Sequence, residues 1–204
     1  RVDKAYLYPE GLVRLKMRDF DRGRVELLVD LGETKHVRVA APDNVPPAPE
    51  RPPNFAMMLR NRIEGAELAG VEQFEFDRIL TLRFERDDRN TTVVAELFGD
   101  GNLAVLDGTN EVVDCLETVR LKSRTVAPGE QYEFPDARFD PLSADRETVA
   151  TRLERSDTDV VRTLATQFNF GGTWAEEVCT RAGVEKTLDV AEVDDSTVDA
   201  LHAT

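Results

Sequence analysis

The sequence contains few of the residues that carry acid–base or thiol chemistry, with only two histidines and two cysteines in 204 residues. His36 and His202 have no partner residue at a useful spacing, so no catalytic constellation emerges. Cys115 and Cys179 are too few for a cysteine-based metal site or a disulfide framework. We therefore expect a binding module with no metal or cofactor, and no enzyme.

Long apolar runs and lysine are also scarce. No run approaches the ~18 apolar residues of a membrane span, and no secretory signal is recognisable, so we expect a reduced, cytoplasmic location. Only 5 of the 26 basic residues are lysines and the net charge is −14, with the acids spread throughout. This balance is typical of adaptation to high salt and points to a halophilic archaeon. It excludes a diffuse basic footprint, so contacts with a polyanion must come from short-range basic clusters.

The first 139 residues have the alternation of β-strands. In an early strand the apolar face consists of Val13, Leu15 and Met17. The opposite face carries three cations, which are Arg14, Lys16 and Arg18. This cation row is either a solvated face balanced by Asp19, Asp21 and Glu26, or a track that binds phosphates. Strands are also predicted at 25–31 and 36–40.

A proline-rich segment, 42–53, holds six of the ten prolines and is predicted to be a surface crossover within one domain. Asn54 is then expected to cap a helix that runs over 55–64 and ends at Gly65. Its apolar stripe comprises Phe55, Met58, Leu59 and Ile63. Arg62 falls within this stripe, so it either pairs with an acid or reaches past the core, or it contacts a partner.

Apolar and polar residues alternate at period 2 over 71–116, Phe74 and Phe76 included. Turns at 87–90, 99–102 and 107–110 interrupt this alternation. This pattern predicts an antiparallel meander. A second row of alternating cations follows, formed by Arg120, Lys122 and Arg124 on a predicted strand. No acid occurs between Val119 and Gly129, which makes this row the strongest candidate for phosphate contact among the basic clusters.

The region 140–204 is expected to be helical. Asp157 is predicted to cap a helix with the stripe Val160, Leu164 and Phe168. Thr173 and Glu176 form a capping-box pattern for a second helix that Gly183 ends, with the stripe Trp174, Val178 and Ala182. Gly171 and Gly172 would form a tight hairpin between the helices, with φ > 0 expected at Gly172. The N-terminus at Gly171, Gly172 and Thr173 could then admit a phosphate, or the pair could be a corner that packs only within its own domain.

Four stretches in order resemble one family. They read AMMLRNRIEGAEL (56–68), VVAELFGDGNLAVLD (93–107), ETVRLKSRTVAPGEQYEFP (117–135) and NFGGTWAEEVCTRAGVEK (169–186). They are similar to the NFACT-N proteins, the family of RqcH and NEMF, also known as fibronectin-binding protein A. The resemblance implies a cytoplasmic factor of ribosome quality control that binds RNA, namely the large ribosomal subunit and the tRNA of an obstructed nascent chain.

The resemblance also implies the fold class. We expect an α+β chain, with an antiparallel β-rich domain like the N-terminal domain of formamidopyrimidine glycosylases over 1–139, and a helix-hairpin-helix domain over 140–204. Family members usually carry further residues before Arg1, and also a coiled coil and an NFACT-R domain, so we expect a truncated helical domain here.

Two rival functions stay open. A DNA-glycosylase-like enzyme would need an amino-terminal nucleophile and usually a four-cysteine zinc finger, whereas this chain has Arg1 and two cysteines. A fibronectin-binding adhesin would need a route of secretion. The resemblance also has a gap at Gly99-Asp100, where eukaryotic members carry Asp-Arg, the pair associated with recognition of aminoacyl-tRNA. A carboxylate at position 100 cannot pair with phosphate, so that activity does not transfer through this motif.

Overall fold

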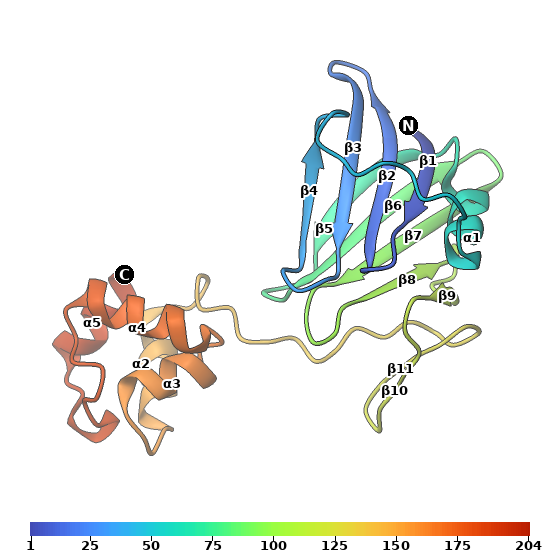
Figure 1. Ribbon diagram of the computed structural model, residues 1–204. Helices are drawn as coiled ribbons and strands as arrows, with labels where there is room; N and C mark the ends of the chain where they lie inside the picture. The colour runs from blue at the N-terminus through green and yellow to red at the C-terminus, as the bar shows by residue number, and fades with distance from the viewer. The chain divides into compact units, whose positions relative to one another are not determined.

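Antiparallel sheets and α-helices make the chain an α+β protein, as predicted. The computed structural model describes residues 1–204, which form two units, Arg1–Asp136 and Ala137–Thr204 (Figure 1). The first unit holds all the strands and one α-helix, and the second is helical.

The first unit contains two antiparallel sheets with strands paired in chain order. The four-stranded sheet consists of β1 (Val2–Leu7), β2 (Leu12–Asp19), β3 (Gly23–Asp30) and β4 (His36–Ala40). The five-stranded sheet consists of β5 (Glu67–Gln73), β6 (Ile79–Arg86), β7 (Arg89–Glu96), β8 (Asn102–Leu106) and β9 (Val112–Cys115). The predicted meander is confirmed. Phe74 and Phe76 are an exception, because Glu75 adopts φ 45° and the chain turns there from β5 to β6.

The two sheets share one hydrophobic core with α1 (Asn54–Ile63). The predicted inward face of β2 is confirmed, since Val13, Leu15 and Met17 are all buried. The apolar stripe of α1 is also confirmed, because Leu59 and Ile63 are buried in this core. Asn54 does not cap the helix: Pro53 holds the N-cap position in an extended conformation, and no side chain bonds the first turn.

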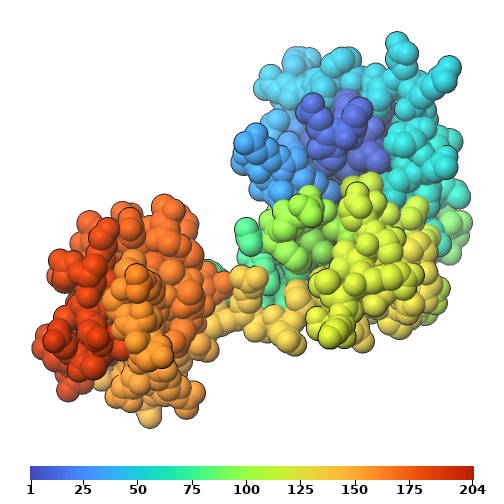
Figure 2. Space-filling view, turned by 60° about the horizontal axis from the view of Figure 1, so that its bottom comes forward, coloured from blue at the N-terminus to red at the C-terminus, as the bar shows by residue number.

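The second face of the five-stranded sheet is covered as well. A smaller core on this side includes Ile79, Val94, Ala104, Val126 and Tyr132. The last two belong to the segment that follows β9, in which β10 (Val119–Arg120) and β11 (Thr125–Val126) form a hairpin. Figure 2 shows this yellow-green segment as part of the surface of the first unit.

The second unit is built from short capped helices. They are α2 (Arg146–Glu154), α3 (Val160–Thr166), α4 (Gly171–Ala182), the 3-10 helix η1 (Val190–Glu192) and α5 (Asp195–Ala203). Asp145, Asp159 and Asp194 each accept a hydrogen bond from the backbone N–H three residues on. Acidic side chains at helix N-termini also suit the helix dipole, which is one use the fold makes of its many acids.

The helix pair α3 and α4 corrects two details of the prediction and confirms others. Val160, Leu164 and Phe168 are buried as predicted, but Asp159 and not Asp157 is the cap. Helix α4 begins at Gly171, so Thr173 and Glu176 both lie inside it and form no capping box. Gly183 ends it at φ 68°, as predicted.

The buried face of α4 also differs from the prediction. Ala175 and Cys179 are buried, and Val178 and Ala182 of the predicted stripe are half-buried against the same core, whereas Trp174 is 62% exposed. Small side chains permit the close packing of α3 on α4, and a tryptophan in their place would force the helices apart.

Candidate nucleic-acid interface

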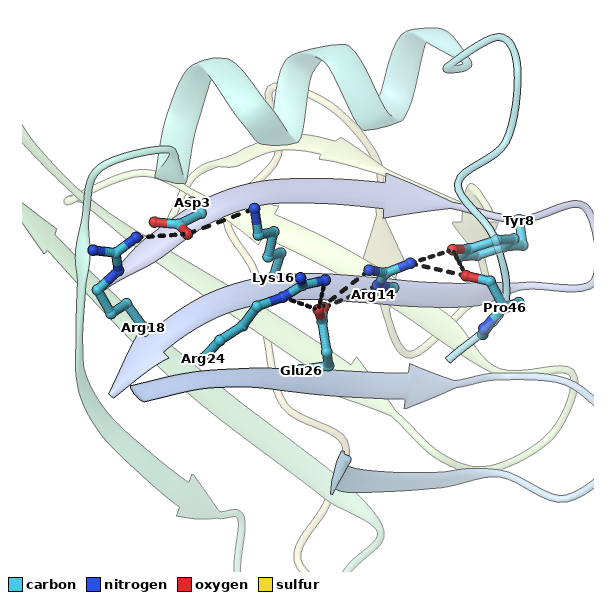
Figure 3. A network of polar contacts seen from close by, with 8 residues as sticks. All are labelled: Asp3, Tyr8, Arg14, Lys16, Arg18, Arg24, Glu26 and Pro46. Atoms are coloured by element: carbon cyan, nitrogen blue, oxygen red, sulfur yellow. Dashed lines mark hydrogen bonds and ion pairs between the residues drawn. The ribbon is translucent and has the colours of Figure 1, made fainter. Parts of the chain in front are cut away.

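The first cation row lies on β2, and its three members differ sharply in exposure. Arg14 is only 5% exposed and Glu26 is fully buried on the neighbouring strand β3. The Nε atom of Arg14 donates to Oε2 of Glu26 at 2.9 Å, and Nη2 of Arg24 donates to Oε1 at 2.8 Å (Figure 3). The Glu26 carboxylate therefore holds two guanidinium groups, and the charge of Arg14 is neutralised inside the protein.

The proline-rich segment completes the surroundings of Arg14. Its Nη1 atom donates to the carbonyl of Pro46 at 2.9 Å and to the hydroxyl of Tyr8 at 3.2 Å, while that hydroxyl donates to the same carbonyl at 3.1 Å. Burial works against the charged guanidinium, but the hydrogen bonds to Glu26 and Tyr8 outweigh it and raise the pKa of Arg14. Burial likewise disfavours the Glu26 carboxylate, but the bonds from both arginines lower its pKa overall. Both shifts favour the ion pair between Arg14 and Glu26.

Lys16 and Arg18 remain at the surface. Both lie near one carboxylate, that of Asp3 on β1, at 3.9 Å and 4.0 Å (Figure 3). Asp19 was expected among their partners, but its Oδ1 atom accepts hydrogen bonds from the backbone N–H groups of Asp21 and Arg22. Pairs as long as these at the protein surface contribute little energy, so neither cation is tightly held by Asp3.

The prediction that the second cation row lies on one strand is wrong. Leu121 and Arg124 exchange backbone hydrogen bonds, so the chain reverses between β10 and β11. Arg120 ends β10 and is exposed, Lys122 is exposed in the turn, and only 8% of the Arg124 side chain is exposed. The chain folds into a hairpin and the cations do not form a single row on a sheet face.

Arg124 anchors this hairpin through a buried polar cluster. Its Nη2 atom donates to the Glu96 carboxylate on β7, and its Nε atom donates to the carbonyl of Glu133 at 2.7 Å. The hydroxyl of Tyr132 donates to Glu96 at 2.8 Å, and the Arg124 guanidinium lies 5.2 Å from the centroid of the tyrosine ring. Burial and the negative charge of Glu96 raise the pKa of Tyr132 well above its ordinary value. The cluster fixes where Arg120 and Lys122 are presented.

A groove of about 1230 Å³ lies beside this hairpin. Its walls come from the β1–β2 turn, the proline-rich segment, the turn Phe98–Gly101 and the hairpin itself. The charged lining is mixed, with Arg51, Arg120 and Arg124 against Glu10, Glu96, Asp100 and Glu117. Periodicity in the sequence could not have revealed this groove, because its walls are four separate loops.

The turn at the edge of the groove carries the departure from the eukaryotic pattern. Gly99 and Gly101 adopt φ 55° and 81°, and Asp100 between them is exposed. A side chain at position 99 would meet no neighbouring atom, but it would have to adopt a left-handed backbone conformation.

Arg62 is half-buried on the last turn of α1. Hydrogen bonds from Thr109 are the main cause of the lowered pKa of Asp107, and the positive charge of Arg62 adds to it. The choice between the two alternatives for Arg62 stays a prediction.

In the second unit, Gly171, Gly172 and Thr173 form the exposed first turn of α4. Phe170 occupies the N-cap position and provides no side-chain acceptor, so the first N–H groups of α4 have no cap from a side chain. The positive φ of 70° belongs to Gly171 and not, as expected, to Gly172. A Cβ added at either glycine would meet open space.

Other types of site have little support. No group of three or more His, Cys, Asp or Glu residues is placed to hold a metal ion. None of the helices combines the length and the apolar character that crossing a membrane requires. The ring of His36 contacts the carbonyl of Thr34 at 2.8 Å and accepts a bond from Arg38, so it has partners of its own.

The chain is an α+β module with a few exposed cations on its first unit, and the whole chain can be assigned to a family. The profile described as "NFACT N-terminal and middle domains" matches residues 1–204, so the chain belongs to this family, as the four sequence stretches indicated.

Curated relatives are similar over most of the chain. An archaeal Rqc2 homolog, aRqcH from Methanocaldococcus jannaschii, is 33% identical over 196 residues, which are 91% of this chain and 29% of the relative. The Rqc2 homolog RqcH of Bacillus subtilis is 27% identical over 162 residues, 73% of this chain and 28% of the relative. The chain thus spans less than a third of the length of these relatives. The Ribosome quality control complex subunit 2 of Saccharomyces cerevisiae is 29% identical over 113 residues, 55% of this chain and 10% of the relative.

Solved structures show the same fold. The N-terminal part of the fibronectin/fibrinogen-binding protein from Streptococcus suis superposes with a TM-score of 0.78 at 20% identity, covering 100% of this chain and 77% of the other. The fibrinogen binding protein from Staphylococcus aureus gives 0.79 at 20% identity, covering 100% and 73%. At this identity the likeness establishes the fold alone.

Proposed function

We propose that this chain is the RNA-binding module of a cytoplasmic ribosome quality control factor, and that it binds the large ribosomal subunit and the tRNA of an obstructed nascent chain. Its family and its curated relatives support this role. The observation that carries the RNA contact is the pair Arg120 and Lys122, two exposed cations on a hairpin fixed by a buried ion pair.

The hairpin that carries Arg120 and Lys122 is pre-organised for RNA binding. A chain with net charge −14 gains no general attraction to RNA, so binding must come from cations held where a phosphate will be. The bonds from Arg124 to Glu96 and to the carbonyl of Glu133 hold the hairpin in place before any ligand arrives. Arg120 and Lys122 then lose little conformational freedom of the backbone on binding.

The neighbouring turn Phe98–Gly101 offers no cation for tRNA recognition. Asp100 is an exposed anion at the groove, and it replaces the arginine of eukaryotic members. We therefore propose that the module holds tRNA through other surfaces, and we make no claim of tailing activity. Asp100→Ala should leave tRNA binding almost unchanged.

The test is the double substitution Arg120→Ser/Lys122→Ser. Affinity for purified large subunits and for tRNA should fall roughly tenfold, with a smaller dependence on salt, because two phosphate contacts are lost. The control Arg78→Ser/Arg83→Ser removes the same charge from exposed positions on or next to β6, away from the groove. Equal binding by the wild type and by the hairpin variant, with the control also unchanged, would remove Arg120 and Lys122 from the interface.

We propose a second RNA contact at α3 and α4, which would act as a helix-hairpin-helix element. The first turn of α4 is exposed and has no side-chain cap, and such backbone N–H groups bind phosphate well. Thr173→Asp separates this function from stability. The added anion should stabilise the helix by about 0.3–1 kcal/mol through the dipole, yet it should weaken RNA binding by repelling phosphate. Thr173→Asn is the neutral control, and unchanged binding by the aspartate variant would make α3 and α4 a purely structural corner.

A further inference from the structure

The tip of the β2–β3 hairpin presents a phenylalanine to solvent. Asp19 pairs with Gly23 across the two strands, so Phe20, Asp21 and Arg22 form the loop. Phe20 is 102% exposed, which means that its ring makes no packing contact within the protein. Since burial of an aromatic ring is a main source of folding energy, a ring held fully in water contributes nothing to the fold.

The tip is a fixed structure. The Asp19 carboxylate accepts hydrogen bonds from the N–H groups of Asp21 and Arg22, at 3.0 Å and 2.8 Å. Gly23 adopts φ 70°, the left-handed conformation that closes a three-residue hairpin loop. Phe20 is therefore carried on an ordered turn, and little backbone entropy would be lost if a ligand packed against the ring.

A hollow of about 650 Å³ adjoins this tip. Its floor is apolar and includes Met17, Val25, Leu27, Val39 and Leu68, of which Val39 is itself largely exposed. Phe20 and the exposed residues Arg18 and Arg22 stand at its rim, together with Asp19 and Glu67. The site thus combines a free aromatic face, an apolar floor and two guanidinium groups.

The sheet next to the tip continues the positive charge. Arg18 lies opposite Arg24 and Lys16 lies opposite Lys4 in the strand register, so these side chains share the outer face. Of the carboxylates on this face, Glu26 is buried between Arg14 and Arg24, and Asp3 lies within 4.0 Å of both Lys16 and Arg18. In a chain of net charge −14, a track of cations that leads to an exposed ring is matched to a polyanion with flat groups.

We propose that the β2–β3 tip binds an unpaired nucleotide of RNA, with the base stacked on Phe20 over the apolar hollow and the flanking phosphates on Arg18 and Arg22. This inference rests on the proposed RNA-binding function. Unpaired bases are favoured over duplex because only a splayed base offers its face to an aromatic side chain. Stacking also keeps its strength in salt that screens charge, whereas phosphate contacts do not.

The test uses the full chain and a short single-stranded RNA that carries an adenine analogue whose fluorescence is quenched by stacking. Phe20→Ala should abolish the quenching and lower the affinity about tenfold, which corresponds to one base stack. Phe20→Trp should preserve both. Arg18→Ser/Arg22→Ser should lower the affinity and reduce its salt dependence while part of the quenching at saturation remains. Leu142→Ser, which removes an exposed apolar side chain from the second unit, is the control.

Two comparisons separate this inference from the function on which it rests. If the Arg120→Ser/Lys122→Ser variant loses RNA and Phe20→Ala binds and quenches as the wild type does, the tip is no nucleotide site and the proposed function stands. If the wild type binds neither RNA nor large subunits, both ideas fail. Equal loss of affinity for a fully paired duplex and for the single strand on Phe20→Ala would also overturn the unpaired-base contact, and would leave the ring as a site for some other partner.

Discussion

The two rows of alternating cations have nearly the same sequence pattern but are used differently. Arg14, Lys16 and Arg18 lie on a regular strand and share one sheet face. Arg120, Lys122 and Arg124 fold into a hairpin and share no face. In each row one arginine is buried against a glutamate and a tyrosine, and the other two cations stay at the surface.

In each row, therefore, the buried arginine and the two cations at the surface have separate tasks. Arg14 joins β2 to β3 and to the proline-rich segment, and Arg124 joins the hairpin to β7. Each one uses its charge inside the protein. The RNA contacts that we propose therefore fall to the exposed members of each row, and the following predictions separate the two tasks.

The largest effect is expected from Glu26→Ala. This change leaves the buried Arg14 without its carboxylate and also releases Arg24, and breaking a buried ion pair from one side costs about 3–5 kcal/mol. Urea unfolding followed by circular dichroism measures the loss. Glu33→Ala, at an exposed position, is the control and should change the free energy of unfolding by less than about 0.5 kcal/mol. A loss below about 1 kcal/mol for Glu26→Ala would mean that the pair does not act as a buried unit.

Tyr132→Phe should have the next largest effect. Its hydroxyl is buried and bonds an ionised carboxylate, and such a bond contributes about 1.5–3 kcal/mol. Tyr8→Phe is the matched change in the other row, where the hydroxyl is only half-buried. It lies between the Arg14 guanidinium and the carbonyl of Pro46, and these two groups also bond each other directly, so neither loses its last partner and the change should cost about 1 kcal/mol or less. Equal losses for the two variants would contradict the greater burial of the Glu96 cluster.

The same tyrosine predicts a dependence on pH. Because the pKa of Tyr132 is raised in the folded state, the unfolded chain loses this proton first, near pH ~10. The contribution of Tyr132 to stability is therefore complete below that pH and is lost above it, by about 1.4 kcal/mol per pH unit. Unfolding of the wild type and of Tyr132→Phe, compared near pH ~9 and near pH ~11, isolates this contribution from other alkaline titrations. Parallel losses in both proteins would exclude it.

The smallest effects are expected from the two lysines of the rows, which lie at the surface. Lys16→Ser and Lys122→Ser should each change the free energy of unfolding by no more than about 0.5 kcal/mol, since neither side chain is buried or held in a close pair. Thermal melting measures this directly. A large loss in either variant would show that the exposed members of the rows also stabilise the fold.

Much of the fold could be predicted from local patterns. Period-2 alternation identified the strands, and the apolar stripes identified α1 and α3. The hairpin turn between Leu121 and Arg124 was missed because its only turn-favouring residue is Ser123, which is a weaker signal than glycine, proline or asparagine. The burial of Arg14 and Arg124 could not be predicted either, since their glutamates lie 12 and 28 residues away in the chain. Spacing likewise could not tell which of Gly171 and Gly172 takes the left-handed conformation.

Local patterns also predicted part of the candidate sites. The sequence marks cations that lack nearby acids along the chain, and Arg120 and Lys122 do remain exposed. It does not mark the groove or the hollow beside Phe20, since both are formed by loops and strands that meet only in three dimensions.

The anchor of the proline-rich segment has a consequence for how this protein can vary. The acceptor for Arg14 and Tyr8 is the main-chain carbonyl of Pro46, an atom that every residue type possesses. Replacement of that proline by another residue keeps the anchor, provided that the backbone stays extended. The segment is thus free to drift in composition and length between its anchor and α1, and an affinity tag or a fluorescent label inserted there should leave both sheets intact.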